Sequence, residues 1–100
     1  MKKIPKSVRI LGRKIPVKLI TRAELDKIYQ GAGALWDSET RTIYIDKNVR
    51  PEIQWMYLYH EMHHALHNIV GVDQFIPGEI LEILCQSGAS FLEDVRDHLQ

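Results

Sequence analysis

Apolar and polar residues alternate along the first part of the chain. Apolar side chains recur at every second position on both sides of a turn-prone Gly12-Arg13-Lys14 segment, at Val8, Ile10, Ile15, Val17 and Leu19. A period of two is typical of strands with one buried face, and a short glycine-containing connection is typical of a hairpin. The pattern therefore predicts a β-hairpin over residues 7–20.

A short helix and a second hairpin are predicted next. Thr21 and Glu24 have the spacing of a capping box, which predicts a helix of about two turns that ends before Gly31. Residues 34–45 then place a turn-prone Asp-Ser-Glu-Thr segment between two runs of apolar, β-branched and aromatic residues. This arrangement predicts a second β-hairpin.

The last half of the chain has the pattern of two long helices. Pro51 is placed to open a helix over residues 52–70, and Gly71 is placed to end it. After a Pro-Gly pair, apolar residues recur at helical spacing over Glu79–Leu99, at Ile80, Leu81, Leu84, Gly88, Phe91, Leu92 and Val95. We therefore expect one α+β domain over residues 1–100, in which two β-hairpins form an antiparallel sheet packed on both long helices.

Composition agrees with one globular domain. The chain has 100 residues, of which 45% are hydrophobic and 26% charged, and its 13 Lys and Arg balance 13 Asp and Glu. Zero net charge argues against a general nucleic-acid-binding protein. The charges are uneven, because residues 1–22 carry eight basic side chains and no acid, whereas residues 79–100 carry five acids and one Arg. We expect the basic strands and the acidic helix to attract one another; a weak acidic or nucleic-acid partner is the alternative.

The single cysteine and the apolar runs bear on location. Cys85 has no second cysteine with which to form an internal disulfide, and its apolar neighbours favour a small core residue over a ligand or a nucleophile. No apolar run approaches the ~20 residues that span a bilayer. We expect a cytoplasmic protein with no membrane segment.

The segment that carries chemistry is His60-Glu61-Met62-His63-His64, which matches the His-Glu-x-x-His pattern of zinc hydrolases. On a helix, residues four apart lie on one face about 6 Å apart along the axis, so the imidazoles of His60 and His64 can converge on one ion. Glu61, beside that face, would act on a water molecule as a general base without binding the ion.

Helical periodicity favours this interpretation over histidines that only satisfy hydrogen bonds in a core. The apolar residues of the helix form one stripe, which consists of Trp55, Leu58, Tyr59, Met62, Ala65, Leu66 and Ile69. His60, His64 and His67 cluster near the opposite side, with Glu61 beside them. A structured but metal-free histidine face is the alternative.

A catalytic zinc site needs three protein ligands and an open position, so another residue must complete it. His67 lies about 10 Å along the axis from His60, too far for one ion, and is expected to line the cleft or support a ligand. His63 is expected to be a surface or packing residue. Glu79 and Glu82 of the last helix are both candidates, and spacing alone leaves the choice open.

Three segments resemble the ImmA/IrrE family of zinc metallopeptidases, in particular its short phage and prophage members. They are Thr42–Asp46, Tyr59–His67 and the run Glu82-x-x-Cys85-Gln86-x-Gly88-Ala89. The resemblance implies a small zincin-like domain in which His60, His64 and Glu82 hold Zn²⁺ and Glu61 is the catalytic base. The family usually has a small residue and an Asn where this chain has Cys85 and Gln86.

The resemblance further implies a zinc-dependent metalloendopeptidase of the gluzincin type. Its substrate would be a protein, such as a repressor or regulator, and the Leu35–Ile45 hairpin offers an edge strand for an extended substrate. A catalytically silent zinc-binding protein that acts as a protein-binding module is the alternative. A third, less favoured hypothesis is a nucleic-acid-associated module that uses Lys2, Lys3, Lys6, Arg9, Arg13, Lys14 and Lys18. The candidates for lining the cleft are Tyr29, Trp36, Tyr44, Tyr57 and His67.

Overall fold

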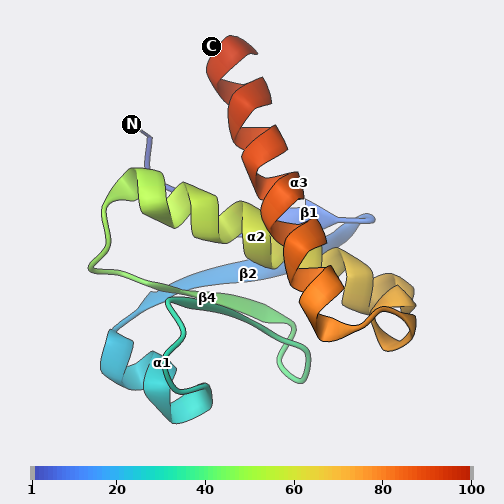
Figure 1. The fold of residues 1–100 in the computed structure, drawn as a ribbon. Coiled ribbons are helices and arrows are strands. Elements are labelled where there is room, and N and C mark those ends of the chain that lie inside the picture. The colour runs from blue at the N-terminus through green and yellow to red at the C-terminus, as the bar shows by residue number, and fades with distance from the viewer. Residues whose placement is uncertain (1, 100) are drawn as a thin grey trace.

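The computed structural model describes residues 2–99, which form a four-stranded sheet, three α-helices and one 3₁₀ turn (Figure 1). In chain order the elements are β1 (Ser7–Ile10), β2 (Arg13–Ile20), α1 (Arg22–Ile28), β3 (Ala34–Asp37), β4 (Thr42–Asp46), α2 (Pro51–Val70), η1 (Val72–Phe75) and α3 (Gly78–Leu99). This order confirms the predicted α+β class and both hairpins.

The first hairpin turns slightly earlier than predicted. β1 pairs antiparallel with β2, with Ile10 opposite Arg13, so Leu11 and Gly12 are the two turn residues. Both have positive φ angles, 51° and 79°, as a two-residue type I′ turn requires. The turn therefore precedes Arg13 and Lys14, which belong to β2.

The predicted all-antiparallel sheet is wrong. The strand order is β1-β2-β4-β3, and the central pair β2 and β4 is parallel, with Val17 opposite Ile43. Helix α1 lies between the hairpins and begins with the predicted capping box of Thr21 and Glu24. Strand β3, antiparallel to β4, returns the chain to the end of the sheet where β2 begins, so that β4 can run parallel to β2.

The strand β4 takes the central position because its residues tolerate burial. Four of its five residues are buried, whereas every residue of β3 is only partly buried. A central strand is covered on both faces and both edges, and β-branched residues suit that environment. Strand β3 therefore remains at the edge of the sheet.

Helix α2 covers one face of the sheet and has the predicted boundaries. Pro51 is its first residue and Gly71 ends it in the left-handed conformation with φ of 82°, which a glycine adopts without strain. Leu58 and Ala65 of α2 are buried against the isoleucines of the sheet. The buried core cluster consists of Ile4, Ile10, Ile15, Val17, Ile43, Ile45, Leu58 and Ala65.

Helix α3 packs on α2 through small residues. Cys85 and Ala89 are fully buried, whereas Ile80, Leu84 and Phe91 of the predicted apolar face are 50%, 44% and 65% exposed. The predicted apolar face of α3 is therefore only partly right, because Leu81, Gly88, Leu92 and Val95 are partly buried. Hydrophobicity alone does not show which residues allow two helices to approach closely. Near its C-terminus, the guanidinium of Arg96 lies 5.4 Å from the ring centre of Trp55 in α2.

The predicted attraction between the basic strands and the acidic helix stays a prediction. Within residues 2–99, no ion pair joins the two groups. None of the helices in the described part of the chain combines the length and apolar character needed to cross a membrane.

Candidate metal centre

The two motif histidines lie side by side on the middle of α2. Their ring centroids are 5.0 Å apart, and His60 Nε2 lies 3.2 Å from His64 Nε2. One turn of regular helix separates the residues, and the backbone is therefore the rigid element that aligns the two nitrogens. This is the convergence that the motif predicts.

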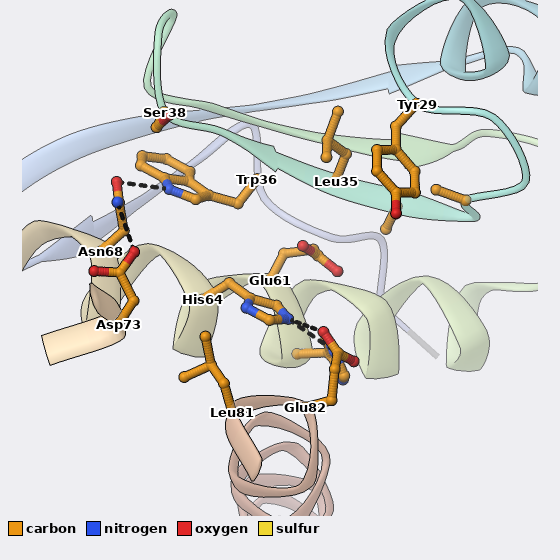
Figure 2. Close-up of a pocket in the computed structure, with 13 residues that line it drawn as sticks. Tyr29, Leu35, Trp36, Ser38, Glu61, His64, Asn68, Asp73, Leu81 and Glu82 are labelled. Carbon is orange, nitrogen blue, oxygen red and sulfur yellow. Dashed lines mark hydrogen bonds and ion pairs between the residues drawn. The ribbon is translucent and has the colours of Figure 1, made fainter. Parts of the chain in front are cut away.

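Glu82 of α3 brings its carboxylate to both histidines, and Figure 2 shows its contact with His64. Its Oε1 lies 2.6 Å from His64 Nε2 and its Oε2 lies 3.1 Å from His60 Nε2. In tetrahedral coordination with bonds of about 2.0–2.1 Å, neighbouring ligand atoms are about 3.3 Å apart. The ligand atoms of the three residues all lie within 4.8 Å of one another, so two imidazoles and one carboxylate fit a zinc ion. Glu79 is not part of this cluster.

The cluster is open toward solvent on the side of Glu82. The side chain of Glu82 is 60% exposed, whereas those of His60 and His64 are 16% and 21% exposed. A catalytic zinc site retains one position that the protein does not fill. The arrangement leaves room for such a position.

Gln86 holds the ring of His60, a contact that the sequence analysis missed. The Nδ1–H of His60 donates to Gln86 Oε1 over 3.0 Å. Because the amide oxygen can only accept, this bond favours the tautomer in which Nε2 keeps its lone pair for a metal. Gln86 lies four residues after Glu82 and within the run that carries the family resemblance, but neither signal showed that its side chain contacts His60.

Glu61 lies beside the histidines, as predicted, and lines the same pocket, but it also belongs to the buried side of α2. It is 9% exposed and shares this buried line with Gln54, Leu58 and Ala65. Burial raises the pKa of Glu61 to about 7, although the electrostatic effect of the neighbouring His60 and a hydrogen bond from the backbone of Trp36 oppose the rise. A carboxyl group with such a pKa can take and release a proton near neutral pH.

The imidazole of His64 is held in its neutral form. Partial burial lowers the pKa of His64, and the nearby carboxylate of Glu82 opposes this shift. Only a neutral imidazole can donate a lone pair to a metal. The environment of His64 therefore favours the form that binds an ion.

A pocket of about 470 Å³ lies in front of the cluster, and Glu61, His60, His64 and Glu82 line it. Its opposite wall includes Tyr29 and strand β3 (Figure 2). Tyr29 and Trp36 were expected to line a cleft, and both do. Tyr57 lines a smaller adjoining cavity together with His60 and Glu61, whereas Tyr44 and His67 line neither of these two cavities.

One end of the pocket is built by a hydrogen-bond chain between three elements. Trp36 Nε1–H of β3 donates to Asn68 Oδ1 of α2 over 3.2 Å, and Asn68 Nδ2 donates to Asp73 Oδ2 of η1 over 2.9 Å. Sequence analysis identified neither Asn68 nor Asp73, because their roles depend on where the edge strand crosses the end of α2. The chain fixes the indole of Trp36 against the helix.

The remaining histidines and the cysteine have packing roles. His63 donates from Nδ1 to the carbonyl oxygen of Tyr59 over 2.7 Å, and its ring lies against Gly88 of α3. His67 Nδ1 lies 3.8 Å from Cys85 Sγ. Burial raises the pKa of Cys85 to about 12, so its thiol stays protonated at neutral pH and is unsuited to act as a nucleophile.

Comparison of the chain with protein-family models, with curated protein sequences and with solved structures finds no match.

Proposed function

We propose that the protein is a zinc-dependent metalloendopeptidase of the gluzincin type with a small zincin-like fold. The observation that carries this proposal is the convergence of His60, His64 and Glu82 beside a buried Glu61 at the wall of an open pocket. The resemblance of the motif segments to the ImmA/IrrE family supports the same activity. It also suggests a phage or prophage protein whose substrate is a repressor or regulator.

His60, His64 and Glu82 would hold the ion. When bound, zinc supplies a Lewis acid that polarises the scissile carbonyl and lowers the pKa of a water molecule. Gln86 keeps His60 in the tautomer that can donate its Nε2 lone pair. The open side of the pocket admits the peptide.

Glu61 would move the proton. Its carboxylate takes a proton from the attacking water molecule and delivers it to the nitrogen of the departing amine, so the base is regenerated after each cleavage. The pKa of about 7 that burial gives Glu61 is close to the working pH of a cytoplasmic enzyme. Burial also keeps bulk water from competing for this proton.

The substrate would be an extended segment of a protein that lies along β3. This strand is at the edge of the sheet, and Ala34, Leu35 and Trp36 of β3 line the pocket. An edge strand offers unpaired backbone groups with which an extended peptide can form hydrogen bonds. Such pairing would place a peptide bond between β3 and the cluster on α2.

A peptidase assay tests this proposal. Zinc-loaded protein is incubated with an unfolded protein such as reduced casein, and cleavage is followed by mass spectrometry beside the variant Glu61→Gln. We expect the wild type to cut, and the variant to keep its zinc but lose cleavage by at least about a hundredfold. Equal cleavage by both proteins would contradict the role of Glu61. The assay is then repeated with repressors encoded near the gene as substrates. If the protein binds zinc but cleaves none of these substrates, the alternative of a silent zinc-binding protein is favoured.

A further inference from the structure

A second groove lies away from the metal centre. It has a volume of about 790 Å³ and is lined by the N-terminal segment, the second half of β2 and the start of α2. It shares no lining residue with the pocket in front of His60 and His64. A volume of this size is within the range of ligand-binding sites.

The groove runs along an open part of the sheet. Strand β1 pairs only with residues 13–16 of β2, and one further bond joins Val17 N–H to the carbonyl oxygen of Lys6 over 2.9 Å. The N-terminal segment then leaves the sheet, and the carbonyl oxygen of Lys2 accepts a hydrogen bond from Trp55 Nε1 of α2 over 2.7 Å. Within the described residues, Lys18–Ile20 therefore has β4 on one side and no strand on the other.

Apolar side chains form the floor of this groove. Ile4 and Val17 are buried there, and Leu19 is 45% exposed. Val49 and Pro51 continue the apolar surface toward α2. No aromatic residue is among the lining residues, although stacking on aromatic rings is the usual way to hold unpaired bases. The floor therefore suits aliphatic side chains better than a nucleic acid.

The rim of the groove is positively charged. Lys3, Lys6, Lys18 and Lys47 line it, all four are exposed, and no acidic residue is among the lining residues. None of the four forms an ion pair with another residue of the described chain. Glu24 is near enough to Lys47 for a small electrostatic effect, but the backbone hydrogen bond from Thr21 is the largest cause of its lowered pKa. The uncompensated lysines favour a negatively charged occupant.

We propose that this groove binds an extended, acidic segment of a partner protein, which adds as a strand to the open edge of β2. The backbone N–H and carbonyl of Leu19 pair with the segment, because they face the open edge, whereas the carbonyl of Ile20 accepts from Lys47 on the β4 side. The aliphatic side chains of the segment contact the floor, and its carboxylates face the four lysines. The acidic α3 of a second copy does not fit, because a helix cannot pair with a sheet edge. The proposal is independent of zinc and of the peptidase reaction.

A binding titration tests the proposal with a defined probe, a short fluorescein-labelled peptide in which Glu and Val alternate. The full-length variant Glu61→Gln is used, so that cleavage of the probe cannot affect the result, and fluorescence anisotropy reports binding. We expect the double variant Lys6→Glu, Lys18→Glu to bind the probe at least about tenfold more weakly. The matched control Arg13→Glu, Lys14→Glu reverses two charges on β2 outside the groove and should change the affinity by less than about twofold.

A second probe removes the need for any groove variant. The same peptide with alternate backbone amides methylated keeps its charge and side chains but loses its hydrogen-bond donors, and we expect it to bind at least about tenfold more weakly. Equal affinity of the two probes, or equal weakening by the groove and control variants, would overturn the proposal. It would also be overturned if the first probe does not bind, if an oligonucleotide displaces it better than unlabelled peptide, or if self-association of the protein blocks its binding.

Discussion

Burial destabilises the ionised form of Glu61. It is 9% exposed, and burial raises its pKa from the usual 4.5 to about 7. Between these two pH values the folded protein binds more protons than the unfolded chain. The stability that Glu61 contributes is therefore fully present below pH 4.5 and is lost as the pH rises toward 7.

The variant Glu61→Gln should remove this dependence, since a glutamine does not titrate. In metal-free protein, we compare the free energy of unfolding of the variant with that of the wild type at each pH. We expect the variant to gain about 2 kcal/mol relative to the wild type between pH 5 and pH 8. The lowered pKa of His64 acts in the opposite direction, but His64 is present in both proteins and its effect cancels. Urea unfolding at the two pH values measures the difference, and a constant offset would show that Glu61 ionises normally in the folded protein.

Glu82 and Glu79 provide a matched pair on the first turns of α3. We expect Glu82→Ala to weaken zinc binding at least about tenfold, or about 1.4 kcal/mol, because it removes a ligand. Glu79→Ala should bind zinc almost normally and lose only roughly 0.5–1 kcal/mol of helix stability. Competition with a chelator measures both affinities. The reverse order would move the third ligand to Glu79.

Gln86 should affect the affinity of the site for zinc without contacting the ion. We expect Gln86→Leu to weaken zinc binding by roughly tenfold, because His60 loses the acceptor that fixes its tautomer. Gln86→Glu keeps an acceptor oxygen and should restore most of the affinity, whereas Ser87→Ala next to it should have no effect. If Gln86→Leu binds zinc as tightly as wild type by the same chelator competition, the hydrogen bond does not position His60.

The packing of α3 on α2 depends on one glycine. A Cβ atom added at Gly88 would clash with Nε2 of His63, whose ring is held by its hydrogen bond to Tyr59. We expect Gly88→Ala to destabilise the protein by about 1–3 kcal/mol in thermal or urea unfolding. Gly78→Ala is the control, because no atom lies within 4 Å of the added Cβ.

The double variant His63→Ala, Gly88→Ala isolates the contact. Once the ring is absent, the alanine at position 88 should cost little further stability, so the two effects should not add. Additive effects would mean that Gly88 is required for another reason.

Local patterns predicted the elements well. The capping box of Thr21 and the helix end at Gly71 depend on neighbours in the chain, and both were confirmed. The parallel pairing of β2 with β4 could not be predicted in this way, because it depends on which hairpin strand tolerates the centre of the sheet. The face of α3 that contacts α2 was only partly predicted for a similar reason, since Leu84 and Phe91 are exposed whereas the small residue Ala89 is fully buried.

The same contrast between local pattern and tertiary contact applies to the candidate site. His60, Glu61 and His64 follow from one pentapeptide on one helix, so their spacing was sufficient. Glu82 and Gln86 come from a second helix, and their contribution depends on the angle at which α3 crosses α2. Spacing in the sequence could not separate Glu82 from Glu79, and the burial of Glu61 depends on the edge strand above it.

A bound zinc ion would link helix α2 to helix α3. Among its contacts with other elements, α3 packs mainly on α2, and its small buried residues provide little apolar area. An ion held by two side chains of α2 and one of α3 would add a direct link between them. Zinc binding should therefore stabilise the folded state, in proportion to the excess of free zinc over its dissociation constant.

Anomalous diffraction at the zinc absorption edge, from crystals of the zinc-loaded protein, is the decisive measurement. We expect one peak per chain, about 2.0–2.2 Å from Nε2 of His60, Nε2 of His64 and a carboxylate oxygen of Glu82. Glu61 should lie outside the coordination sphere. The absence of a peak, or a peak coordinated by His67, Glu79 or Glu61 in place of these ligands, would contradict the assignment of the zinc site.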